Sequence, residues 1–150
     1  MKLKDILAKK GNTVWTVKFD QTIQQALEVL VTKKIGALVV LDESGRIAGI
    51  ISERDIIRGS YVHPRELVDF PVSKFMTKKV IIGSPDDETN YIMGIMTQSR
   101  IRHIPVVHEG KLEGLVSIGD IVKSVIDDSN YEIHYLKEYM YGPDQQHDSR

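Results

Sequence analysis

The residues of this chain that could do chemistry are a serine and an aspartate that occur twice at one spacing. Ser52 and Asp55 follow a glycine and two apolar residues, and Ser117 and Asp120 stand in the same context 65 positions later. A serine three residues before an acidic residue has the spacing of a helix capping box. A helix N-terminus can also bind phosphate through its free backbone N–H groups, and an adjacent carboxylate can accept hydrogen bonds from a ribose diol. The motif therefore allows two interpretations, a structural cap or a corner of a nucleotide site.

The segments around the two motifs also repeat, and they predict the elements that position each serine–aspartate corner. In the first half we expect strands at 14–17, 37–41 and 46–51 and helices at 22–33 and 52–59. In the second half we expect strands at 80–82, 101–107 and 111–116, a helix with 85–88 as its first turn, and another helix from 117. Each half has the order β-α-β-β-α and is too small to bury its apolar faces alone. We predict an α/β fold of two pseudo-twofold-related repeats packed sheet to sheet.

The repeats also predict the domain organisation. The first repeat, with an N-terminal helix that ends at Gly11, is expected at 1–62. A linker that contains prolines is expected at 63–71, and the second repeat at 72–128. Residues 129–150 are expected to form a C-terminal helix at 131–140 and a polar tail. Together these segments are predicted to make one module.

Composition and charge argue against several functions. The 150 residues include no cysteine, which rules out thiolate catalysis and disulfides, and the formal net charge of −1 gives no field to attract DNA or an anionic membrane. The five histidines have no metal-binding spacing, so no metal is expected. No apolar run approaches the roughly 20 residues of a membrane span, and we recognise no signal peptide. We therefore expect a cytoplasmic protein.

The repeated corner of glycine, two apolar residues and Ser-x-x-Asp, placed behind an apolar hairpin, resembles that of CBS domains (cystathionine β-synthase domains). A pair of these domains is called a Bateman module, and the resemblance covers roughly 14–126. It implies a regulatory module that binds an adenine-containing ligand between the repeats. AMP is the ligand that we expect first, with ADP, ATP, NAD(H) and S-adenosylmethionine as alternatives.

The resemblance also implies a set of ligand-binding residues, in which Asp55 and Asp120 hold ribose hydroxyls. For the Asp120 cleft, the matching positions are Thr16, Val17, Gly36, Ala37, Arg102, His103 and Ser117. For the Asp55 cleft, they are Gly36, Ala37, Ser52, Arg54, Ile82, Gly83, Arg102 and His103. Pro105, in the same predicted strand as Arg102 and His103, is a further predicted ligand-binding residue.

One cation distinguishes the two motifs. Arg54 directly precedes Asp55, whereas the second motif, 117–120, contains no cation. Because a guanidinium can bind phosphate through two hydrogen bonds, we expect the Asp55 cleft to be the better phosphate site. The alternative is that Arg54 is an exposed residue of the first helical turn, paired with Glu53 or Glu28.

Three functions remain in competition. The favoured one is a homodimeric sensor of adenine nucleotides that modulates a separate, unknown partner protein, with the helices after each Ser-x-x-Asp motif at the dimer interface. The alternative is a ligand-free dimeric interaction scaffold with degenerate clefts. An enzyme acting on a nucleotide is not expected, because the sequence offers no nucleophile paired with a base and no metal set.

Overall fold

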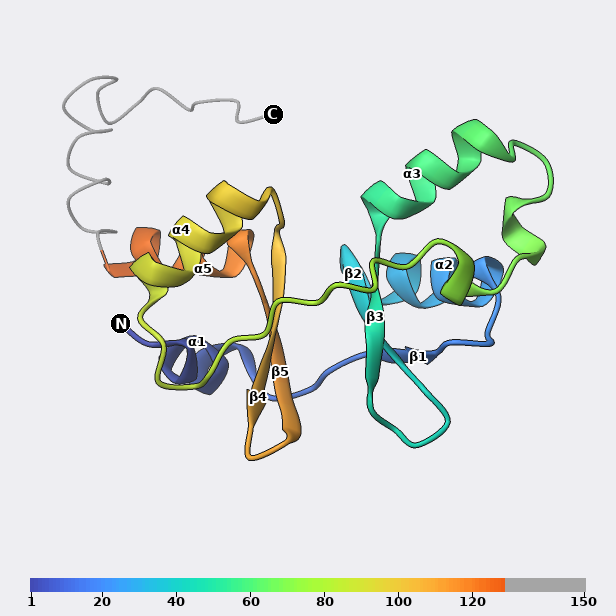
Figure 1. Cartoon of the computed structure of the whole chain (residues 1–150). Helices are drawn as coiled ribbons and strands as arrows, with labels where there is room; N and C mark the ends of the chain where they lie inside the picture. Colours follow the sequence, from blue (N-terminus) through green and yellow to red (C-terminus); the bar gives the residue numbers. More distant parts are fainter. Residues whose placement is uncertain (129–150) are drawn as a thin grey trace, which may run out of the picture.

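Two small sheets lie at the centre of the computed structural model, which describes residues 1–128 (Figure 1). In the first sheet, β1 (Thr16–Lys18) pairs in parallel with β2 (Ala37–Leu41), and β2 pairs antiparallel with β3 (Ile47–Ser52). In the second, β4 (His103–His108) pairs antiparallel with β5 (Lys111–Ser117). The sheets face each other, and the helices cover their outer sides. This is the predicted mixed α/β fold of two repeats.

The two hairpins correspond in detail. The register of the first shifts between Val40 and Leu41, and that of the second shifts between Val106 and Val107, at the equivalent place. Most of β2 is fully buried, which explains its unbroken run of β-branched and aliphatic residues. The equivalent irregularities show that the sequence repeat is also a repeat of backbone geometry.

Within residues 1–128, five helices accompany the sheets, and their ends follow local sequence signals. They are α1 (Leu3–Lys10), α2 (Ile23–Lys33), α3 (Glu53–Val62), α4 (Thr89–Ser99) and α5 (Ile118–Asp128), and two short 3-10 turns lie at Leu67–Asp69 and Val72–Lys74. Thr22 Oγ1 caps α2 by accepting the Gln25 N–H at 3.2 Å. α1 ends at Gly11, whose φ of 95° favours glycine. α2 and α4 end at the left-handed residues Lys34 and Arg100.

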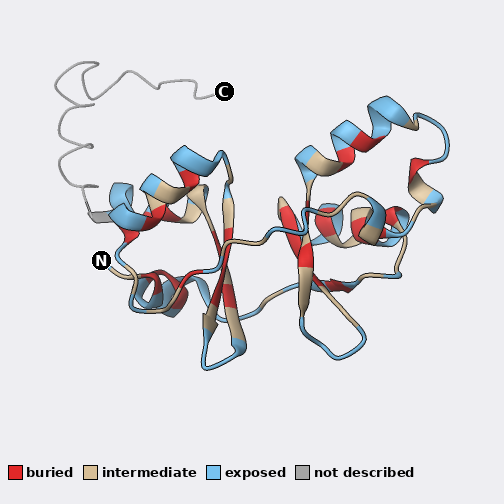
Figure 2. Cartoon of the chain, in the orientation of Figure 1, coloured by how far each residue is buried: buried red, intermediate tan, exposed pale blue. Residues whose placement is uncertain are grey.

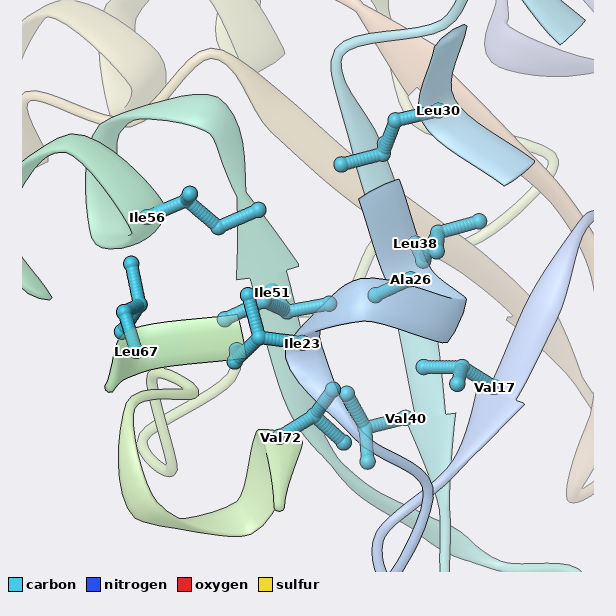
Figure 3. Packing of buried hydrophobic residues seen from close by; sticks show 10 residues of the cluster. All are labelled: Val17, Ile23, Ala26, Leu30, Leu38, Val40, Ile51, Ile56, Leu67 and Val72. Carbon is cyan, nitrogen blue, oxygen red and sulfur yellow. The ribbon is translucent and has the colours of Figure 1, made fainter. Parts of the chain in front are cut away.

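The two hydrophobic cores exchange the segments that precede each repeat. Leu3, Ile6 and Leu7 of α1 pack in the core of the second repeat with residues of α4, β4, β5 and α5. Conversely, Leu67 and Val72, which follow the first repeat in sequence, pack in its core (Figure 3). Figure 1 shows α1 beside β4 and β5 accordingly. The N-terminal helix therefore packs with the second repeat, although it precedes the first in sequence.

Several predicted elements differ from the structure. Residues 80–82 form no strand, because this part of the chain makes only an isolated parallel bridge between Gly83 and Val106. Residues 85–88 precede α4 and are not its first turn, since Glu88 is the N-cap. α3 continues past Gly59 to Val62. The predicted helix at 131–140 lies outside the described residues, and no helix within 1–128 is long and apolar enough to cross a membrane.

Candidate functional site

The first serine–aspartate corner joins β3 to α3 and forms the predicted capping box. Asp55 Oδ2 accepts hydrogen bonds from the backbone N–H of Ser52 at 2.9 Å and from its hydroxyl at 3.0 Å. The backbone N–H of Asp55 donates in return to Ser52 Oγ at 3.4 Å. The other carboxylate oxygen, Oδ1, accepts the hydroxyl of Thr77 at 3.2 Å. Asp55 thus caps α3 through Oδ2, and its Oδ1 contacts a neutral hydroxyl group and not a cation.

The second corner has the same capping geometry with a different neighbour. Asp120 Oδ2 accepts the Ser117 N–H at 2.8 Å, and Asp120 donates its N–H to Ser117 Oγ at 3.0 Å. Lys10, from α1, adds a 2.7 Å ion pair to the same Oδ2. Burial raises the pKa of the Asp120 carboxyl, but the hydrogen bonds from Lys10 and Ser117 outweigh it and hold the pKa below its ordinary value.

A cleft of about 600 Å³ opens beside the first corner, between the two repeats. This volume is in the range of small-molecule sites. Its walls come from the β3–α3 corner, from the extended chain at 77–81 and from the end of α4 through the start of β4. The residues that line it are Gly36, Ile50, Ser52, Glu53, Arg54, Asp55, Ile57, Arg58, Thr77, Lys79, Val80, Ile81, Ser99, Arg100, Ile101, Arg102 and His103.

Positive charge dominates this cleft. Five of its lining residues are cationic, namely Arg54, Arg58, Lys79, Arg100 and Arg102, against two carboxylates, Glu53 and Asp55. Arg54 Nη1 donates to the carbonyl oxygen of Arg100 at 3.2 Å. That carbonyl lies at the C-terminal end of α4, where the helix dipole favours a cation. The contact holds the Arg54 guanidinium across the cleft, so neither predicted carboxylate partner, Glu53 nor Glu28, forms an ion pair with it among residues 1–128.

Backbone contacts fix the two corners against the strands that precede them. The Glu53 N–H at the start of α3 donates to the carbonyl of Gly36 at 3.0 Å, and the Ile118 N–H at the start of α5 donates to the carbonyl of Arg102 at 2.8 Å. These two bonds are equivalent under the repeat. Each helix N-terminus is therefore held in a set position beside the strand of its own repeat.

His103 lies between the two corners. A side chain at Gly36 would come within 3.2 Å of the imidazole Nε2, so glycine there lets the second repeat pack against the first. Burial lowers the pKa of His103, and the charge of Lys10 lowers it further, while Asp120 and Glu53 act in the opposite direction. The imidazole therefore favours the neutral form and is sensitive to charges on both corners.

The cleft brings together six of the predicted site residues, which are Gly36, Ser52, Arg54, Asp55, Arg102 and His103. The other predicted residues do not line it. Val17, Ala37, Gly83 and Pro105 are buried, Thr16 and Ile82 are exposed, and Ser117 and Asp120 form the second corner.

Sequence reasoning missed part of the site. Lys79, Val80 and Ile81 line the cleft where Ile82 and Gly83 had been expected, because the chain turns inward at Gly83 to bridge Val106. It also missed Lys10 at the second corner. A usable signal existed for Lys10, since Lys9-Lys10 and Lys78-Lys79 occupy similar places ahead of the two repeats.

The described residues contain no group of three or more metal-ligating side chains that could hold an ion. The residues that line the cleft supply hydrogen bonds, charge and apolar surface. The cleft offers a carboxylate beside a helix N-terminus, several guanidinium groups and apolar walls from residues such as Ile57 and Ile81.

Comparison with known proteins agrees with this geometry. A sequence model of the CBS domain matches the chain twice, at residues 3–61 and 72–127. The CBS domain-containing protein CBSX3, mitochondrial, of Arabidopsis thaliana is 34% identical over 149 residues, which cover 93% of this chain and 72% of that protein. The crystal structure of the CBS-domain protein ATU1752 from Agrobacterium tumefaciens has a TM-score of 0.81 and 41% identity, covering 83% of this chain and 93% of that one.

A third comparison concerns a structure with bound ligands. The CBS domain pair of protein MJ0100, solved in complex with 5′-methylthioadenosine and S-adenosyl-L-methionine, has a TM-score of 0.73 and 25% identity, covering 83% of this chain and 99% of that one. The repeated corners, the sheet arrangement and these matches agree. The chain belongs to the CBS-domain family and is a tandem CBS pair of the kind that serves as a regulatory module.

Proposed function

We propose that this protein is a sensor that binds an adenine nucleotide in the Asp55 cleft and passes its occupancy to a separate partner protein. The observation that carries the proposal is the 600 Å³ cleft, in which the Ser52–Asp55 corner is combined with five cationic residues. Asp55 Oδ1, now bonded to the Thr77 hydroxyl, is the acceptor for a ribose hydroxyl. The two ligands in the structure of the MJ0100 pair are both adenosine compounds, which supports the same class here.

The charge of the cleft favours a particular kind of adenine ligand. Five cationic lining residues exceed what one phosphate group needs, and they disfavour the cationic sulfonium of S-adenosylmethionine. AMP was the ligand expected first from the sequence. The lining instead favours ligands with two or more phosphates, so we rank ATP and ADP above AMP, and AMP above S-adenosylmethionine.

Isothermal titration calorimetry with ATP, ADP, AMP, S-adenosylmethionine and GTP tests this proposal. We expect the order just given, weaker GTP binding, and affinities that fall as salt screens the cleft charges. Arg54→Ala removes a charge-assisted contact and is expected to raise the Kd for ATP about tenfold. Arg46→Ala, in the exposed turn between β2 and β3, is the matched control and should leave it unchanged. Absence of binding by all five compounds would favour the ligand-free scaffold.

We also propose that the protein is a homodimer through α3 and α5. Of the apolar residues expected at this interface, Ile56 and Ile121 belong to the cores, whereas Ile57, Val122 and Val125 are 68%, 45% and 50% exposed. Tyr61 on α3 is 90% exposed as well, and Figure 2 shows the exposed face of this helix. A mass of twice 17.0 kDa by light scattering is expected, and a monomer at micromolar concentration would remove the claim. The cytoplasmic location stays a prediction, for which cell fractionation is the test.

A further inference from the structure

The carboxylate of the second corner already has a cationic occupant from the chain itself. Lys10 Nζ lies 2.7 Å from Asp120 Oδ2 and 2.6 Å from the carbonyl oxygen of Leu115 in β5. The ammonium therefore bridges a side chain and a backbone group of the same β5–α5 corner. The ammonium takes Oδ2, the oxygen that also accepts the Ser117 N–H, and its positive charge is paired with the carboxylate that a ribose diol would contact.

The packing of α1 explains why Lys10 reaches this corner. Leu7 lies against Gly114, so closely that a methyl group at Gly114 would overlap the leucine side chain. Lys10 follows Leu7 by three residues, about one helical turn, and stays on the same face of α1. The glycine that precedes Ser117 in the motif thus lets α1 approach and brings its last lysine to Asp120.

The first corner has an equivalent glycine contact and an equivalent lysine, but this lysine does not pair with the aspartate. Met76 lies against Gly49 as Leu7 lies against Gly114, and Lys79 follows Met76 by three residues. Here the chain is extended, because Thr77 pairs with Ile50 in an isolated bridge. An extended segment rises about 3.3 Å per residue and a helix about 1.5 Å. Lys79 is consequently carried past the carboxylate and lines the cleft.

We propose that Lys10 is a built-in occupant of the Asp120 corner that limits the module to one tightly bound nucleotide per chain, at the Asp55 cleft. This inference rests on the proposed function and adds a determinant of stoichiometry to it. A ribose diol that contacts both oxygens of Asp120 has to replace Lys10 at Oδ2, whereas at Asp55 the ribose hydroxyl replaces the neutral Thr77 hydroxyl at Oδ1. The Lys10 side chain is 38% exposed, so water compensates for part of its loss. We expect the displacement to weaken binding at Asp120 at least about tenfold.

The test is calorimetric titration of ATP into the full chain and into Lys10→Met, which shortens the unbranched side chain by one atom and removes its charge. The wild type is expected to bind one ATP per chain, and Lys10→Met a second with affinity improved at least about tenfold. Lys9→Met is the matched control, on the exposed surface of the same helix, and is expected to behave as the wild type. Circular dichroism of each variant controls for a loss of overall helix content.

Other outcomes separate this inference from the proposed function. One ATP bound by both proteins would overturn the role of Lys10 and leave the Asp55 site in place. Two bound by the wild type and one by Lys10→Met would show that Lys10 holds a ligand phosphate, which also overturns it. A single ATP bound only by Lys10→Met would support the role of Lys10 and overturn the Asp55 site. No binding to either protein would overturn both.

Discussion

Leu3→Ala tests the exchange of segments between the two cores. Leu3 is completely buried and belongs to the core of the second repeat. Truncation of a buried leucine removes apolar contacts and leaves a cavity, which typically costs about 2–5 kcal/mol of unfolding free energy. For a chain of this size, each 1 kcal/mol lowers the Tm by about 2–4 °C. The expected fall in Tm is therefore about 4–20 °C.

The location of the damage is the sharper part of this prediction. Hydrogen–deuterium exchange followed by mass spectrometry measures the protection of each strand and helix separately. We expect Leu3→Ala to lower protection in α4, β4 and β5 before it affects α2 and β2. Lys9→Ala, on the exposed side of the same helix, should change the unfolding free energy by less than about 0.5 kcal/mol.

Two results would refute this reasoning. The first is a loss of protection centred on α2, β2 and β3, which would mean that the N-terminal helix stabilises the repeat that follows it in sequence. The second is a change in unfolding free energy below about 1 kcal/mol, which is too small for a fully buried leucine.

Two further predictions concern the glycine of the first corner and the histidine between the corners. Gly49→Ala is expected to lower the unfolding free energy by about 1–3 kcal/mol in urea titrations, since its Cβ would lie 2.7 Å from the Thr77 carbonyl and 2.8 Å from the Met76 sulfur; a variant as stable as the wild type would contradict the close packing at this position. Burial lowers the pKa of His103 in the folded protein below the value of about 6.5 in the unfolded chain. As the pH is lowered through this range, the unfolded chain binds more protons than the folded protein, and the folded state loses stability. His103→Gln should lessen the loss of stability between about pH 7 and pH 5, and identical pH profiles for the two proteins would show that His103 is not buried as described.

Local sequence signals predicted those parts of the fold that depend on neighbours in the chain. The apolar run at 37–41 forms β2, Thr22 caps α2, and both serine–aspartate pairs make the hydrogen bonds of a cap. Each depends on residues within a few positions of one another, so period and spacing suffice to find them. The repeat then related the two halves and identified the family.

The parts that escaped prediction depend on contacts between distant segments. Lys10 reaches Asp120 across 110 positions, because Leu7 packs against a glycine of the other repeat. Residues 80–82 resemble a strand locally, but they lie between two isolated bridges, one from Thr77 to Ile50 and one from Gly83 to Val106, and pair with no strand themselves. No local pattern contains these constraints, since they arise only when the two cores exchange their leading segments.

Binding of an adenine nucleotide in the Asp55 cleft is tested by calorimetric titration of ATP into the wild type, Asp55→Ala and Asp120→Ala. Loss of the ribose contact at Asp55 is expected to raise the Kd at least about tenfold. Asp120→Ala should leave the affinity of the Asp55 site unchanged. Because each substitution also removes a helix cap, circular dichroism is needed to show that the variants keep their helix content. Unchanged affinity in Asp55→Ala, together with loss of binding in Asp120→Ala, would contradict the account and place the working site at the corner that Lys10 occupies.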